Sequence, residues 1–490
     1  MALRKQAVRG VSWSLVERWG AELLSISVFM VLSRQLSVQA FGLVALASVV
    51  IDFARRIVDG GFAEALVQRG ELDRAHLDTA FWTGIVTGGV MAAALALLAA
   101  PIAAAFGEPE LTPVLRWLSL AFVVRGLSST QQAILVRTLR FNQLAIRTLV
   151  AELGAGIVAI SLALSGWGVW SLVAQQLAAG ILGVITLWTV AAWRPGLDFR
   201  WSHFRELALF GVNIVGFKLL NVFSQKVDSL VIGSFLGTVA LGYYSVATRI
   251  FHAITKVLGG VLAAVAFPVF SRLQADPERM RRAYYEATQL TALIALPAFF
   301  GLAAIAPDAI PWAFGAKWEP SVPVMRVLAG VGVLQSLRQL NGSLIKAAGK
   351  PSWRLGVALL QTAVTSLAIL VVVDGGITAV ALAMLAAGLA TYPVAIAVVR
   401  RLVGIRLGRY AAQFAGPLLA AVLCAAAALG TRAAGAELAT PLRIGLSVAA
   451  GGAAYGLALR LVAPELLRRV WTLAADVLPI GRVKAQTREA

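Results

Sequence analysis

The chain has 490 residues, of which 59% are hydrophobic and only 14% charged, and its mean hydropathy is +0.81. These values exclude an ordinary soluble globular protein, in which about 25% of residues are charged. The formal net charge is +19, but its distribution along the chain indicates membrane topology and argues against a nucleic-acid partner.

Apolar runs of membrane-spanning length recur along the whole chain and are separated by short polar breaks. They predict an all-α polytopic membrane protein with about 14 transmembrane helices. We expect these helices to begin near residues 11, 40, 79, 114, 144, 168, 207, 238, 284, 323, 352, 376, 410 and 441. The first residues, MALRKQAVRG, do not resemble a cleaved signal peptide, so the first helix is expected to remain as a span.

The positions of the 43 Lys and Arg residues predict the orientation. Most of them fall in one alternating set of loops and in the two terminal segments, and few fall in the other set. Because positively charged short loops are retained in the cytoplasm, both termini are predicted to be cytoplasmic, in a multi-pass protein of the cell inner membrane.

Four charged residues interrupt the apolar segment VIDFARRIVDGG, which covers residues 50–61 of the second predicted helix. At helical spacing, Asp52, Arg55, Arg56 and Asp59 fall within a ~100° arc. Each such charge costs about 2.5 to 3.5 kcal/mol at the centre of a lipid-facing helix, more than the apolar neighbours return. This face is therefore not expected to contact lipid.

Comparable polar stripes occur on other predicted helices. The first helix has Ser14, Arg18, Glu22 and Ser25; the seventh has Lys218, Asn221, Gln225 and Asp228; the eighth has Ser245, Arg249, His252 and Lys256. Weaker stripes surround Arg125 and Arg338. Candidate substrate-binding residues are Arg18, Arg55, Arg56, Arg125, Lys218, Asn221, Gln225, Arg249, His252, Lys256 and Arg338; candidate ion-coupling residues are Glu22, Asp52, Asp59 and Asp228.

An internal repeat relates the two halves of the chain at an offset of about 200 residues. LSVQAFGLVALA, from Leu36, aligns with LGTVALGYYSVA, from Leu236, and pairs Gly42 with Gly242. The repeat predicts an N-terminal six-helix lobe (residues 1–200), a C-terminal six-helix lobe (201–405), and two additional helices with a cytoplasmic tail (406–490). A solvated cavity is expected between the lobes, lined by helices 1, 2, 7 and 8.

The charge balance of the stripes suggests the chemistry of the substrate. Lys218, Lys226, Arg249 and Lys256 on helices 7 and 8 face only Asp228 as a counter-charge. Buried positive charge needs an anion, and a phosphate-bearing substrate would supply it. Alternatively, Asp52 and Asp59 neutralise Arg55 and Arg56 within their own helix and only fix its packing.

The segments FGLVALASVVIDFARRIVDGGFAEALVQRG, LDTAFWTGI and ILVRTLRF resemble the polysaccharide-transport (Wzx-type) flippases of the multidrug/oligosaccharidyl-lipid/polysaccharide exporter superfamily. The resemblance implies a V-shaped pair of six-helix lobes that flips an oligosaccharide on a polyprenyl diphosphate carrier by alternating access. Lipopolysaccharide, capsule or exopolysaccharide would be the product. The expected partners are this lipid-linked oligosaccharide, the bilayer and other polysaccharide assembly proteins.

Several other functions are less compatible with the sequence. The short external loops and the missing phosphate-binding loop argue against an enzyme and against ATP-driven transport. Cys424 is the single cysteine, and His76, His203 and His252 are too scattered in sequence to predict a metal site. No cofactor is expected, apart from protons or Na⁺ as coupling ions. A multidrug or metabolite antiporter of the same superfamily and a non-transporting scaffold of an envelope-polymer complex remain as alternatives.

Two polar segments are expected along the membrane interface. One is the basic and aromatic connection WRPGLDFRWSHFREL, from Trp193. The other is DPERMRRAYYEATQL, from Asp276, which is expected to form a separate helix before the ninth span.

Overall fold

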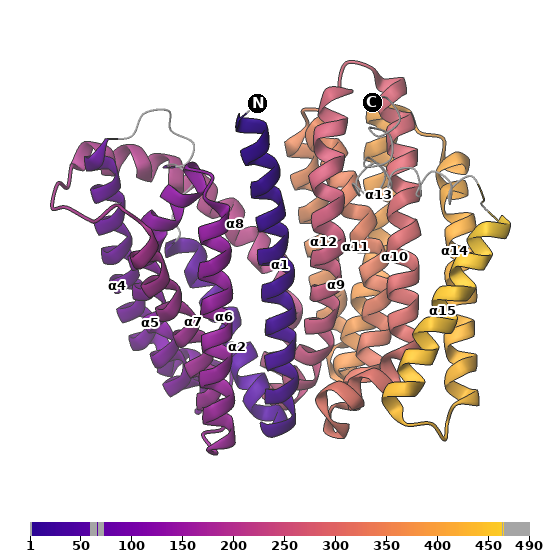
Figure 1. Ribbon diagram of the computed structural model, residues 1–490, viewed down its shortest axis with the longest axis horizontal. Coiled ribbons are helices and arrows are strands. Elements are labelled where there is room, and N and C mark those ends of the chain that lie inside the picture. Colours follow the sequence, from indigo (N-terminus) through magenta and orange to yellow (C-terminus); the bar gives the residue numbers. More distant parts are fainter. Residues whose placement is uncertain (1, 59–65, 67–72, 463, 465–490) are drawn as a thin grey trace, which may run out of the picture. The chain divides into compact units, whose positions relative to one another are not determined.

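The computed structural model describes residues 2–58, 66, 73–462 and 464 (Figure 1). Some side chains within residues 2–18, 206–218 and 257–265 are outside this description. All regular elements of the described residues are helical, which confirms the all-α class.

The helices of the first part of the chain are α1 (Ala2–Gln35), α2 (Val38–Val58), α4 (Arg74–Ala105), α5 (Leu111–Arg137), α6 (Phe141–Leu164), α7 (Val169–Val190) and α8 (Trp201–Phe235). Those of the second part are α9 (Gly237–Arg272), α10 (Pro277–Phe314), α11 (Ser321–Ala347), α12 (Pro351–Val372), α13 (Gly376–Val403), α14 (Leu407–Ala434) and α15 (Thr440–Val462). Two short 3₁₀ turns are η1 (Ala316–Trp318) and η2 (Val373–Gly375).

Eight helical segments among the described residues are long and apolar enough to cross a membrane. The helices α1, α2, α8, α9 and α11 are also long enough to cross a membrane. These five helices carry most of the predicted polar stripes. The apolar segments show that the protein is a multi-pass membrane protein.

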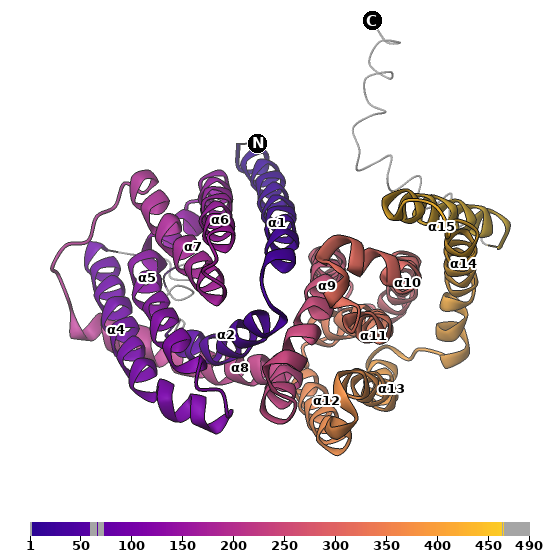
Figure 2. The same ribbon diagram turned by 90° about the horizontal axis from the view of Figure 1, so that it is seen from below.

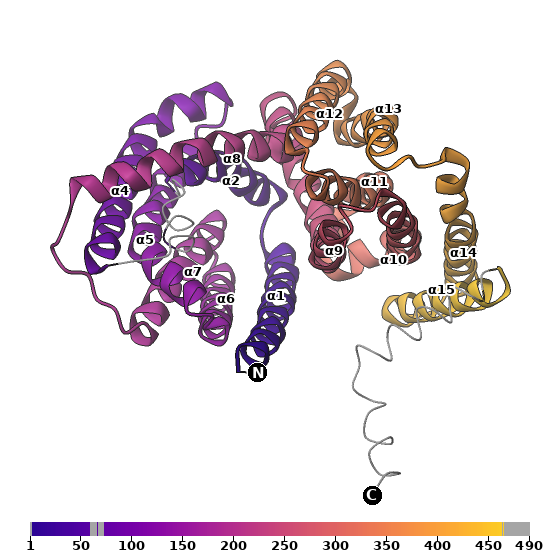
Figure 3. The same cartoon turned by 90° about the horizontal axis from the view of Figure 1, so that it is seen from above.

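The chain folds into two compact units. Unit 1 comprises residues 1–246 and 369–380, and unit 2 comprises residues 247–368 and 381–490. In unit 1, α4 packs on α5, α6 on α1 and α7, and α8 on α2 and α4 (Figure 2). Viewed from the other end, α8 runs alongside α2 and α4 (Figure 3). These contacts explain why unit 1 extends beyond residue 200, where the sequence repeat predicts a lobe boundary.

The start of α9 is fixed in unit 1 by a close helix crossing with α2. A Cβ atom on Gly42 would lie 1.7 Å from the carbonyl oxygen of Thr238, and one on Gly242 would lie 2.3 Å from that of Val38. Only glycine permits this approach. In addition, the backbone N–H and the hydroxyl of Thr238 donate to Glu108 Oε1, from the α4–α5 connection, at 3.2 and 2.8 Å.

In unit 2, α10 packs on α11, α14 and α15. One acidic residue joins three of these helices: Asp308 of α10 accepts from Arg432 of α14 and from Arg443 of α15, each at 2.8 Å. Asp308 is 7% exposed. These two ion pairs fasten the α14–α15 hairpin to α10.

The expectation of a separate interfacial helix after Asp276 is wrong. Residues Pro277–Phe314 form one continuous helix, α10. Asp276 caps its start by accepting from the backbone N–H groups of Glu278 and Arg279, and Pro277 occupies the first helical position. The polar segment and the following span therefore propagate as a single helix.

Candidate functional site

The polar stripe of α2 is held by an ion pair with α8. Asp52 lies 3.7 Å from Arg55 on its own helix and 3.3 Å from Lys226 on α8. All three side chains are partly exposed, at 27%, 40% and 33%. The carboxylate of Asp52 therefore pairs with two cationic side chains, so Asp52 contributes to helix packing as well as to the polar face. Arg56 is half-buried on the same helix.

The structure does not describe the side chains of three of the predicted site residues. Asp59 is not among the described residues, and the side chains of Arg18 and Lys218 are not described either. On α1, Glu22 is half-buried.

The stripe of α8 separates into an exposed part and a buried part. Asn221 and Gln225 are exposed and are hydrogen-bonded to each other, one helical turn apart. Asp228, in contrast, is 7% exposed and accepts from the hydroxyl of Tyr244 at 2.5 Å and from the backbone N–H of Ser229 at 2.7 Å. The charge pattern predicted Asp228 as the counter-charge of the nearby cations, whereas these two hydrogen bonds come from neutral donors.

The stripe of α9 includes polar side chains near the middle of a long helix. Arg249 is half-buried, whereas His252 and Lys256 are exposed. His252 is 15 residues beyond the start of α9, about 22 Å along the helix axis at 1.5 Å per residue. Since the hydrocarbon core is about 30 Å thick, this exposed charge and imidazole would lie at membrane depth. Contact of a charged side chain with lipid would be costly at that depth.

One of the two weaker predicted stripes, that of Arg338, has hydrogen-bond partners on a neighbouring helix. Arg338 of α11 donates to the carbonyl of Gly388 at 2.6 Å and to the hydroxyl of Thr391 at 3.2 Å, both on α13. Arg125 is half-buried on α5. These two hydrogen bonds of Arg338 connect two helices of unit 2.

Sequence reasoning missed a polar group between α1 and α6. Glu17 accepts from the hydroxyl of Thr148 at 2.8 Å, and Arg147 interacts electrostatically with Glu17 and Arg125. A Cβ atom on Gly183 of α7 would lie 3.1 Å from the guanidinium of Arg147, so this glycine makes room for it. Arg147 lies six residues inside α6. The adjacent charged residues Glu17 and Arg18 were the feature of the sequence that could have indicated this polar group.

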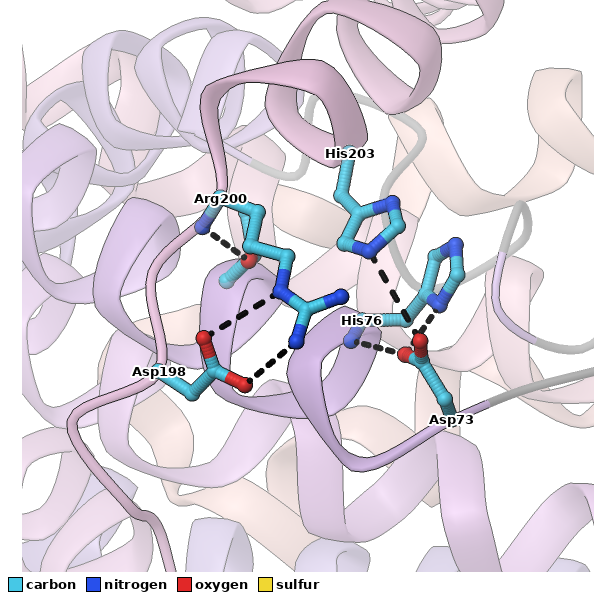
Figure 4. Close-up of polar contacts among 6 residues, drawn as sticks. Asp73, His76, Asp198, Arg200 and His203 are labelled. Carbon is cyan, nitrogen blue, oxygen red and sulfur yellow. Dashed lines mark hydrogen bonds and ion pairs between the residues drawn. The ribbon is translucent and has the colours of Figure 1, made fainter.

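Two of the three histidines come together, contrary to the expectation that they are too scattered. The rings of His76 and His203 have centroids 3.6 Å apart. Asp73 contacts both imidazoles at the starts of α4 and α8 (Figure 4). His252 belongs to α9 instead.

The fold and these contacts define a class: a helical multi-pass membrane protein with charged residues along several of its long helices. The chain belongs to the family described as polysaccharide biosynthesis protein, whose model matches residues 31–323. This match covers α2 through α10, the region that holds most of the stripes.

Two curated relatives agree with this family. The chain is 31% identical over 327 residues to the succinoglycan biosynthesis transport protein ExoT of Rhizobium meliloti (strain 1021), covering 66% of each chain. It is 28% identical over 357 residues to the lipopolysaccharide biosynthesis protein WzxC of Escherichia coli (strain K12), covering 71% of each. The solved structure of the lipid II flippase MurJ in an inward closed conformation is similar in fold, with a TM-score of 0.74 over 93% of this chain and all of that one, at 12% identity.

Proposed function

We propose that this protein is a flippase that moves a polyprenyl-diphosphate-linked oligosaccharide across the inner membrane for the synthesis of lipopolysaccharide, capsule or exopolysaccharide. The relatives named for succinoglycan transport and lipopolysaccharide biosynthesis support the substrate class. The MurJ-like fold supports a carrier for a large amphipathic lipid. In this proposal the protein is a transporter and has no catalytic role.

The observation that carries the proposal is the polar surface of α9. His252 and Lys256 are exposed and Arg249 is half-buried on one stripe of a helix long enough to span the bilayer. A diphosphate needs cationic donors along its path, because its charge is expensive to move through a low-dielectric core. We propose that Arg249, His252 and Lys256 provide these donors, together with Arg55, Arg56, Asn221 and Gln225 on α2 and α8.

We propose an architecture of fourteen spans with cytoplasmic termini and two six-helix lobes related by the internal repeat. The reciprocal packing of Gly42 and Gly242 supports the repeat, because Gly42 faces Thr238 and Gly242 faces Val38, and Val38 and Thr238 are equivalent in the repeat. Alternating access of the two lobes around a polar path would then move the head group.

We propose that a downhill proton or Na⁺ movement drives the cycle. Asp52 is a candidate because it already binds two cationic side chains, and loss of either one in a second conformation would change its affinity for a small cation. Asp59, Glu22 and Asp228 remain candidates from the sequence.

A multidrug antiporter is the competing transporter. A cationic drug needs acidic or aromatic walls, whereas the exposed residues of the α9 stripe are basic or neutral. The charge of α9 therefore favours an anionic substrate.

Lipid analysis of a deletion strain tests the proposed substrate. Deletion of the gene should cause a polyprenyl-diphosphate oligosaccharide to accumulate in the membrane fraction, detected by mass spectrometry of lipid extracts. Complementation with the wild-type chain should remove it, whereas complementation with Lys256→Ala should not. Lys346→Ala is the matched control, because Lys346 lies at the end of α11 and outside the stripes. An unchanged lipid profile on deletion would contradict the proposal.

A further inference from the structure

A cluster of two histidines and one aspartate lies outside the polar stripes, where α4 and α8 begin (Figure 4). Asp73 Oδ1 accepts from His76 Nδ1, and Asp73 Oδ2 lies 3.7 Å from His203 Nε2. Each residue offers one ligand atom, and the three atoms lie within 4.8 Å of one another. The carboxylate thus stands between two imidazole nitrogens contributed by different helices.

The charge and burial of the cluster suit a cation ligand set. His76 is 6% exposed, and its second ring nitrogen, Nε2, is buried without a hydrogen-bond partner among the described residues. The backbone N–H of His76 donates to Asp73 at 2.8 Å and holds the pKa of that carboxyl below its usual value. Asp73 remains half exposed, which leaves a route for an ion from water.

The elements that carry the cluster are fastened to one another. The backbone N–H of Gly196 donates to Asp78 at 2.9 Å, and the indole N–H of Trp82 donates to the carbonyl of Gly196 at 2.8 Å. The backbone N–H of Arg200 donates to the hydroxyl of Thr79 at 3.1 Å. These bonds fix the connection before α8 against α4, so that His203 is presented to Asp73 and His76.

The one nearby guanidinium in Figure 4 is already neutralised. Arg200 pairs with Asp198 at 3.2 Å. Its charge therefore opposes a bound cation less than an unpaired guanidinium would.

Two imidazoles and a carboxylate are a ligand set typical of Zn²⁺ and related divalent transition metals. In a tetrahedral site with bonds of about 2.0 to 2.1 Å, neighbouring ligand atoms are about 3.3 Å apart. The present separations, all within 4.8 Å, require a contraction of at most about 1.5 Å, which small side-chain rotations can provide. We propose that Asp73, His76 and His203 form a site for a divalent transition metal that binds the start of α8 to α4.

Binding at this site has a defined proton balance. His76 Nδ1 now shares a proton with Asp73. Coordination through that nitrogen would move its proton to the second ring nitrogen, Nε2, so a neutral imidazole would bind the metal without net proton release, and Asp73 would exchange a hydrogen bond for a metal bond. A water molecule would fill the fourth position, since three protein ligands leave it open. This proposal does not depend on the transport function.

The competing explanation is a hydrogen-bonded brace with no metal. Amide side chains distinguish the two, because Asn and Gln preserve a donor near the imidazole nitrogen but are poor zinc ligands. The test uses the full chain in detergent micelles with any histidine tag removed, since a tag would bind the same metals. Zn²⁺ binding is measured by equilibrium dialysis with elemental analysis, and thermal stability is measured with and without Zn²⁺.

We expect one Zn²⁺ per wild-type chain and a higher melting temperature in its presence. His203→Gln and His76→Asn should each weaken binding at least tenfold and abolish the zinc-dependent shift in melting temperature. His252→Gln is the matched control and should bind as the wild type does. If His76→Asn fails to fold, Asp73→Asn replaces it, because Asn also caps helix starts well. Failure of the wild type to bind Zn²⁺, or undiminished binding by His203→Gln, would overturn the proposal.

Discussion

Gly42 and Gly242, which are equivalent in the sequence repeat, pack against each other's helix in a reciprocal way. Gly42 of α2 faces Thr238 of α9, and Gly242 of α9 faces Val38 of α2. Val38 and Thr238 are themselves equivalent in the repeat alignment. A contact that exchanges equivalent partners is what a local two-fold relation between duplicated segments produces.

This crossing predicts a large effect of very small substitutions. Gly42→Ala or Gly242→Ala would place a methyl group 1.7 or 2.3 Å from a carbonyl oxygen, so the helices must separate. We expect a loss of about 3 kcal/mol or more for each variant, the upper end of the range for overpacking. The measurement is the melting temperature in detergent. Gly89→Ala on α4 is the control, because no atom lies within 4 Å of its added Cβ; a shift as large as that of Gly42→Ala would refute the packing argument.

The pair of Asp52 and Lys226 predicts energetic coupling between α2 and α8. Asp52→Asn leaves Lys226 and Arg55 without their carboxylate, and we expect a loss of about 1 to 2 kcal/mol, reduced from the fully buried case because the side chains are partly exposed. Lys226→Met should lose a similar amount. The double variant should lose less than the sum, as measured by thermal unfolding in a double-mutant cycle. Strictly additive losses would show that the pair is not coupled.

The contacts of Asp52 show which features of the candidate site could be predicted from the sequence and which could not. Helical spacing predicted that Asp52, Arg55 and Arg56 share a face, because the 3.6-residue period is a local property. It did not predict Lys226 as the partner, since periodicity gives the direction of a side chain and not which helix lies opposite. His76 and His203 were missed for the same reason: they are distant in sequence and meet only because α8 starts beside α4.

Continuity of helices was also hard to predict. The polar start of α10 suggested a separate element, yet its cap at Asp276 and the apolar run that follows belong to one helix. Composition separates polar from apolar segments, but it does not show whether the backbone bends between them.

The bridge from Asp308 to Arg432 and Arg443 predicts a loss of stability in unit 2. Asp308→Asn preserves the shape but leaves two guanidinium groups without a counter-charge. We expect a loss of about 2 to 3 kcal/mol, below the range for fully buried pairs because Arg432 is about one third exposed. The melting temperature in detergent provides the measurement. Asp374→Asn is the control at an exposed carboxylate of η2, and an equal effect of both substitutions would exclude a specific role of the bridge.

The exposed stripe of α9 predicts water access at membrane depth. In a background in which Cys424 is replaced by Ala, His252→Cys should react with a membrane-impermeant thiol reagent, because the thiolate forms only in water. Ile294→Cys is the control, since Ile294 is an exposed apolar residue near the middle of α10 and is expected to face lipid. The measurement is the rate of labelling in membrane vesicles. Equal, very slow labelling at both positions would show that water does not reach the α9 stripe.

Transport of the purified substrate by the purified protein tests the central claim most directly. Proteoliposomes containing the wild-type chain should move a polyprenyl-diphosphate oligosaccharide between leaflets, as measured by its accessibility to an added glycan-modifying enzyme. Lys256→Ala should reduce the rate by tenfold or more, whereas Lys256→Arg should retain most of it because the positive charge is preserved. Protein-free liposomes give the background rate. A wild-type rate no greater than that background, or an undiminished rate with Lys256→Ala, would contradict the account of a basic substrate path on α9.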